Sequence, residues 1–134
     1  MVGEHKKSKT INIILWTAQV LLSVTFIWAG SMKIFNSEDL PWKWIKENPL
    51  LTTVTGVLDL LAGIGIVLPA LLRVIPKLTI YSGWGTVALM LTASIFHISR
   101  GEATQIGFNI FVGLIAVFIA WGRQTKAPIT PRSV

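Results

Sequence analysis

The chain has 134 residues, enough for one domain, and only 13% of them are charged while 52% are hydrophobic. Soluble domains carry about 25% charged residues, so this composition indicates lipid as the surrounding solvent. The absence of cysteine excludes disulfides, thiolate metal sites and cysteine nucleophiles. The net charge is +6, but the basic residues lie between apolar runs and are not collected on one face, which disfavours nucleic-acid binding.

Four apolar segments have about the length that a helix needs to cross a bilayer, and they cover residues 11–35, 50–68, 78–99 and 104–121. Helices are favoured over strands because four strands cannot close a barrel and open strands leave backbone amides unpaired in lipid. The sequence therefore predicts an all-α membrane protein, a four-helix transmembrane bundle over residues 11–122. Residues 1–10 form an N-terminal segment, and residues 123–134 a disordered tail.

The first apolar segment begins after basic residues, as a cleaved signal peptide does, but its 25 residues exceed the usual 7 to 15. A retained span is favoured. With four spans, both termini lie on one side, and that side holds eight of the 12 basic residues. The positive-inside rule then places both termini in the cytoplasm.

The loop over residues 36–48 is the longest between spans. Asp39 is a candidate cap for a short helix with Pro41 in its first turn, which would put Trp42, Trp44 and Ile45 at the level of the lipid headgroups. We expect a short interfacial helix on the outer side here. An extended connector marked by two tryptophans is the alternative.

Polar residues inside the spans are the strongest functional signal, because a charge at the bilayer centre costs at least about 2.5 kcal/mol. Asp59 lies about 13 Å below the outer boundary, while Lys33, His97 and Asn109 lie nearer to it. We expect these four residues, from four helices, to form a polar pocket that opens outward with Asp59 at its floor. The inner half holds little beyond Gln19.

Each of these residues also has an ordinary structural interpretation. Lys33 can extend to the headgroups, His97 can bond a carbonyl at the boundary, and Asn109 can bridge two helices. Asp59 is central, so it is either neutral and hydrogen-bonded or charged and paired with a cation such as Lys33. Met90 and Ser94 share a helix face with His97.

These observations define the predicted sites. The ligand-binding residues are Lys33, Asp59, Met90, Ser94, His97 and Asn109, and Asp59 with His97 is a candidate acid/base pair. An apolar cavity with a few polar groups suits a quinone or a lipid-like molecule. One histidine and one membrane carboxylate are too few for a metal site, so no metal is expected.

Two stretches resemble the DoxX and DoxX-like family of small bacterial four-span membrane proteins. Residues 26–33 read FIWAGSMK and residues 56–65 read GVLDLLAGIG, followed by Leu68-Pro69, with His97 and Asn109 further on. The family has glutamate more often where this chain has Asp59. The resemblance covers about residues 11–122 and implies a bacterial inner-membrane location and partnership with quinone-linked oxidoreductases, the family being named for subunits linked to thiosulfate:quinone oxidoreductase.

The leading functional hypothesis is a binding protein for a quinone or lipid-like molecule, accessory to quinone-linked redox or stress processes. The alternatives are a membrane-embedded acid/base enzyme acting on a lipid-like substrate, a proton-coupled transporter, and a structural subunit that docks a partner. Expected partners are membrane lipid, the apolar ligand, and either a second copy in a homodimer or membrane oxidoreductase subunits, with no nucleic acid.

Overall fold

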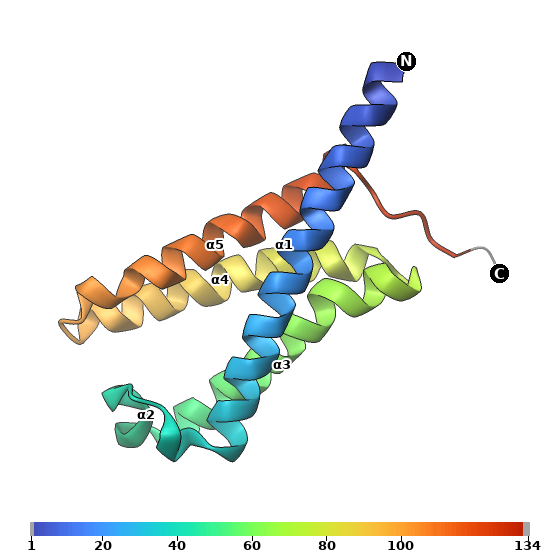
Figure 1. Ribbon diagram of the computed structural model, residues 1–134. Coiled ribbons are helices and arrows are strands. Elements are labelled where there is room, and N and C mark those ends of the chain that lie inside the picture. The colour runs from blue at the N-terminus through green and yellow to red at the C-terminus, as the bar shows by residue number, and fades with distance from the viewer. Residues whose placement is uncertain (1, 133–134) are drawn as a thin grey trace.

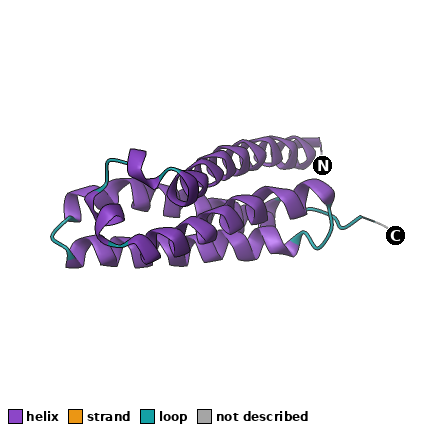
Figure 2. Cartoon of the chain, turned by 90° about the horizontal axis from the view of Figure 1, so that it is seen from below, coloured by secondary structure: helices purple, strands orange, loops and turns teal. Residues whose placement is uncertain are grey.

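The computed structural model describes residues 2–132, with side chains from residue 9 onward. Within that part of the chain every regular element is a helix and no strand occurs (Figure 2). The long helices are α1 (Val2–Phe35), α3 (Pro49–Leu72), α4 (Lys77–Ser99) and α5 (Ile106–Trp121). The short ones are η1 (Ser37–Asp39), α2 (Lys43–Glu47), η2 (Ala103–Gln105) and η3 (Gly122–Lys126).

The long helices form two antiparallel pairs, α1 with α3 and α4 with α5, which meet mainly through α3 and α4 (Figure 1). The pairs diverge toward the end that carries α2 (Figure 1). We call that end the outer end, and the opposite end, toward which both termini lie, the inner end, following the predicted orientation.

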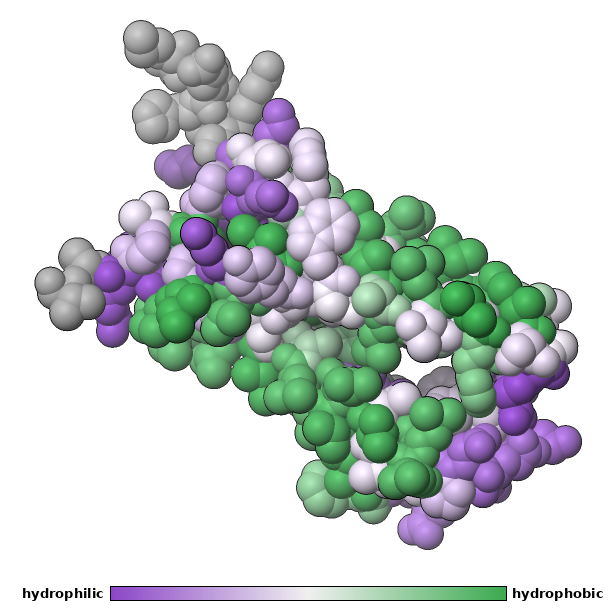
Figure 3. All heavy atoms as spheres, turned by 180° about the vertical axis from the view of Figure 1, so that it is seen from behind, coloured by the Kyte–Doolittle hydropathy of each residue, from purple (hydrophilic) through white to green (hydrophobic). Residues whose placement is uncertain are grey.

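Four helical stretches are long and apolar enough to cross a membrane, namely Lys9–Phe35, Pro49–Leu72, Lys77–Ser99 and Ala103–Lys126. Large apolar side chains are exposed along all four, and Figure 3 shows them as a broad band between polar ends. A small core of Leu22, Phe26, Ile66, Met90, Val112, Ala116 and Ile119 holds the helices together. The predicted all-α membrane bundle is confirmed.

Glycines allow a close crossing between α1 and α3. A methyl group at Gly30 would lie 2.6 Å from the carbonyl oxygen of Gly56, and one at Gly56 would lie 3.2 Å from that of Gly30. No larger residue fits at Gly30 without moving the backbone of α3. This crossing sets the distance between the helices that carry Lys33 and Asp59.

The connection between α1 and α3 is helical, but it is built differently from the expectation. Asp39 ends η1 and caps nothing, and α2 begins at Lys43, after Pro41. Trp44 and Ile45 are buried with Leu40 and pack on Met32, Leu51 and Phe96, so they face the protein. A tryptophan side chain buries a large apolar area, so its packing against α1, α3 and α4 stabilises this connection.

The chain after Trp121 also differs from the predicted disordered tail. The helix continues as a π-helical turn over Gly122–Lys126, and Arg123 within it is buried. Ala127 is buried as well, and the backbone nitrogen of Arg132 donates to the carbonyl oxygen of Arg73 in the α3–α4 turn. Hydrogen bonds made by Arg123 hold this segment against the bundle.

Candidate functional site

The sequence leaves open whether Asp59 is neutral or paired with a cation such as Lys33, and the structure pairs these two residues. The Nζ atom of Lys33, at the end of α1, donates to Oδ2 of Asp59 on α3 at 2.8 Å. The side chains are only 14% and 5% exposed. Because a charge placed in this layer needs a partner, the pair accounts for the position of both residues.

A hollow of about 400 Å³ lies at the junction of α1, α2 and α3, and we call it the outer hollow. Lys33, Ile45 and Thr52 are among the residues that line it, whereas Asp59 is not. Asp59 does not line the hollow itself and is linked to it through its ion pair with Lys33. The predicted arrangement, with Asp59 as the floor itself, is replaced by one in which Lys33 faces the hollow.

The indole ring of Trp44 links the ion pair to α4. Its centroid lies 5.4 Å from Lys33 Nζ, close enough for a cation–π contact, and 6.3 Å from the ring of His97. The ring of Phe96 is 5.8 Å from that of Trp44 in an edge-to-face arrangement. The side chains of α2 thus cross the space between the two helix pairs at the outer end.

His97 is bonded to Glu102 and not to Asp59. Its Nδ1 lies 3.1 Å from Glu102 Oε1, and Arg100 Nε donates to the same oxygen at 3.0 Å. Arg100 also donates to Glu47 of α2 at 2.6 Å. The hydrogen bonds from His97 and Arg100 lower the pKa of Glu102, and those to Glu47 and Glu102 raise the pKa of Arg100.

The other residues of the predicted site lie on α4 and α5. Met90 belongs to the core, and the Ser94 hydroxyl donates to the Met90 carbonyl of its own helix. The amide Nδ2 of Asn109 is buried and has no hydrogen-bond partner among the described residues. Of the six predicted ligand residues, the structure brings together Lys33 and Asp59, with His97 connected to them through Trp44.

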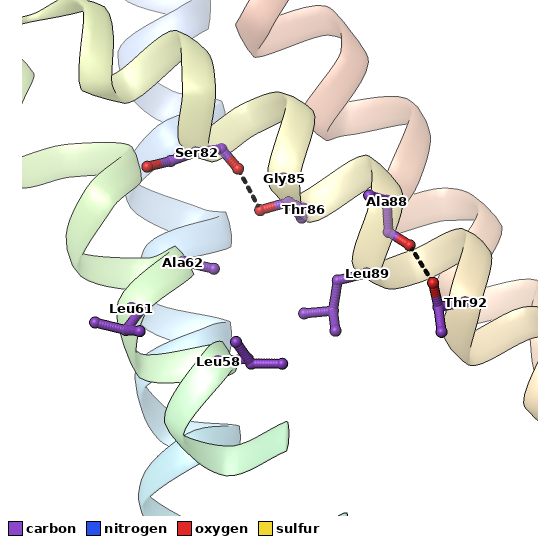
Figure 4. Close-up of a pocket in the computed structure, with 9 residues that line it drawn as sticks. All are labelled: Leu58, Leu61, Ala62, Ser82, Gly85, Thr86, Ala88, Leu89 and Thr92. Atoms are coloured by element: carbon purple, nitrogen blue, oxygen red, sulfur yellow. Dashed lines mark hydrogen bonds between the residues drawn. The ribbon is translucent and has the colours of Figure 1, made fainter. Parts of the chain in front are cut away.

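A second depression, the α3–α4 groove, opens between the two helix pairs and measures about 420 Å³. Leu58 and Ala62 of α3 line one wall, and Thr86 and Leu89 of α4 line the other (Figure 4). The hydroxyl groups of the two threonines on the α4 wall donate to carbonyl oxygens of their own helix, Thr86 to Ser82 and Thr92 to Ala88. The groove therefore offers an apolar surface beside the helix that carries Asp59.

The sequence interpretation missed a polar cluster at the inner end. Arg123 Nε donates to Oε1 of Gln19 at 2.7 Å, and its Nη1 donates to Asn12 at 2.6 Å and to the Ala127 carbonyl at 2.9 Å. Gln19 in turn donates to the carbonyl of Ile66 on α3. Asn12 and Gln19, seven residues apart on one face of the first span, were the available signal.

The fold and this site define a class of protein: a four-span helical integral membrane protein with an ion pair buried between its first and second spans. The model of the DoxX-like family matches residues 17–119, and the chain belongs to that family. No curated protein and no solved structure matches the chain.

Proposed function

We propose that this protein binds an apolar small molecule with exposed oxygen atoms, of the quinone or lipid type, at the Lys33–Asp59 pair. The observation that carries the proposal is the buried ion pair whose lysine is one of the residues that line the outer hollow. An ammonium group has three donors, and Asp59 occupies one of them at Oδ2. Donors therefore remain for a carbonyl oxygen of the ligand.

The surroundings of Lys33 suit such a ligand. Trp44 provides an aromatic surface next to the ammonium group, and Ile45 and Ile34 provide apolar walls of the hollow. The other lining residues are mostly polar, with Glu38 and Lys46 among them, so the apolar part of the ligand would lie against Trp44 and the isoleucines. In this role the protein is accessory to quinone-linked redox or stress processes in the bacterial inner membrane, where it works with oxidoreductase subunits.

The binding function is favoured over acid/base catalysis by the hydrogen bonds. Catalysis by Asp59 and His97 requires both groups at one substrate, whereas the structure pairs Asp59 with Lys33 and His97 with Glu102. Proton flux in liposomes that contain the pure protein would support a transport function. Turnover of a bound ligand without an added electron carrier would support the enzyme instead.

The test is quinone binding by purified protein in lipid nanodiscs, measured by native mass spectrometry with a ubiquinone-type and a menaquinone-type quinone. Lys33→Met is expected to reduce the bound fraction at least tenfold, since the loss of one charged hydrogen bond changes affinity by that order. Lys43→Met is the matched control, because Lys43 is exposed and lies outside the hollow. Equal binding by wild type and a folded Lys33→Met protein would refute the proposal.

A further inference from the structure

The inner end of the bundle contains a second buried cation, remote from the outer hollow. Arg123 is 2% exposed, and its guanidinium group lies 5.3 Å from the ring centroid of Trp16. Its hydrogen-bond partners are the amides of Gln19 and Asn12 and one backbone carbonyl, all of them neutral. The cluster binds the guanidinium but does not neutralise it.

Two buried polar atoms at this end have no partner among the described residues. They are Nη2 of Arg123 and the hydroxyl oxygen Oγ1 of Thr79, which is fully buried. Buried polar groups are nearly always hydrogen-bonded, so two orphans at one end of the bundle call for a common explanation.

The helix register places Thr79 and Arg123 at the same level of the bundle. A methyl group at Gly83 of α4 would lie 3.0 Å from Cβ of Ala120 on α5, and the two helices run antiparallel there. Thr79 lies one turn before Gly83, and Arg123 lies about one turn after Ala120. Helix α4 also contacts η3 directly.

The charges near this level favour an anion over water. Among the described side chains, the carboxylates are Glu38, Asp39, Glu47, Asp59 and Glu102, and the elements that carry them place them toward the outer end or at the outer ion pair. No ion pair with Arg123 occurs among residues 9–132. A guanidinium N–H and a hydroxyl are both hydrogen-bond donors, as an anion requires.

We propose that a small monovalent anion of chloride size binds between the guanidinium group of Arg123 and the hydroxyl group of Thr79. Enclosure limits the size, because neither orphan atom is accessible from outside. The anion would neutralise the buried charge and would connect η3 to α4. This site is separate from the Lys33–Asp59 pair and does not depend on the function proposed for that pair.

The experiment uses the full chain in detergent micelles at constant ionic strength, with gluconate replaced stepwise by chloride or bromide. The midpoint of thermal unfolding is expected to rise and to saturate with either halide. Thr79→Val should weaken the apparent halide affinity about tenfold or more, because a hydrogen bond to a charged group is lost. Arg123→Gln should abolish the dependence.

Lys126→Gln is the matched control, since Lys126 is a cation of the same segment with an exposed side chain, and its halide response should equal that of the wild type. If Arg123→Gln does not fold, anomalous scattering from bromide in wild-type crystals decides, with a peak beside Thr79 expected. A midpoint that is independent of halide, or one that responds to phosphatidylglycerol and not to chloride, overturns the proposal, the latter because a lipid phosphate would then occupy the site.

Discussion

Replacing Lys33 by methionine is expected to destabilise the bundle, because the change leaves the Asp59 carboxylate buried without its cation. The methionine side chain has nearly the same length and lines the same hollow, so the substitution removes the charge while largely preserving the packing. The double variant Lys33→Met/Asp59→Leu removes both charges at once. Comparison of these proteins with the wild type separates the ion pair from its surroundings.

The structure sets the expected magnitudes. Breaking a buried pair by removing one partner costs about 3 to 5 kcal/mol, and we expect about 3 kcal/mol for Lys33→Met because 14% of that side chain is still exposed. Replacing a buried pair by apolar residues of similar volume is often neutral or stabilising. The free energy of unfolding of the double variant should therefore be within about 1 kcal/mol of the wild-type value or higher than it.

The assay is reversible unfolding in mixed micelles with increasing dodecyl sulfate, followed by circular dichroism, for the wild type, both single variants and the double variant. The double variant should be much less destabilised than the sum of the two single variants, which gives a large coupling energy. If the double variant is destabilised by the sum of the single changes, the two residues act independently. That result would refute the argument that they form a buried ion pair.

Three other predictions concern the rest of the molecule. Because hydrogen bonds lower the pKa of Glu102 in the folded protein, its contribution to stability is present at neutral pH and is lost as the pH falls below about 4.3, and Glu102→Gln should flatten the acid side of a plot of unfolding midpoint against pH. Gly30→Val should cost about 1 to 3 kcal/mol or abolish folding, since its side chain would overlap the backbone of α3, as measured by the same unfolding assay. In this cysteine-free chain, Lys43→Cys should react with an impermeant maleimide added to intact cells, and Gln124→Cys should react only after the cells are opened.

Each of these predictions has its own control. The pH effect should survive in the exposed variant Asp39→Asn, which lies outside the cluster around Glu102. Gly107→Ala should be tolerated, because a methyl group there would meet nothing within 4 Å. Labelling of Gln124→Cys in intact cells would contradict the predicted orientation and would exchange the names of the inner and outer ends.

The pairing of Lys33 with Asp59 could be predicted only as one of two alternatives, because a carboxyl group within a span can be neutral and hydrogen-bonded or charged and paired with a cation. The partner of His97 could not, since it depends on how the chain turns after Ser99, where Gly101 adopts a left-handed conformation with φ of 75°. The resulting loop brings Glu102 back to the histidine. A spacing rule for helices does not apply across such a turn.

The burial of Arg123 was also beyond the sequence, for a different reason. A basic residue just after the last apolar segment is the ordinary mark of a cytoplasmic boundary, and the charge count used it in that way. Only the side chains of α1 show that it is enclosed, because they provide amide partners for the guanidinium. The burial of Trp44 likewise depends on Phe96, which is distant in the sequence.

The divergence of the two helix pairs determines how an apolar molecule could reach the α3–α4 groove. The α3–α4 groove opens on the side of the molecule, at the depth of the apolar band, and its walls carry exposed leucines (Figure 3, Figure 4). A molecule dissolved among the acyl chains can therefore reach the groove by diffusion within the bilayer plane, without passing through water. The occupancy of the groove by such a molecule then depends on the amount dissolved in the membrane and not on its solubility in water.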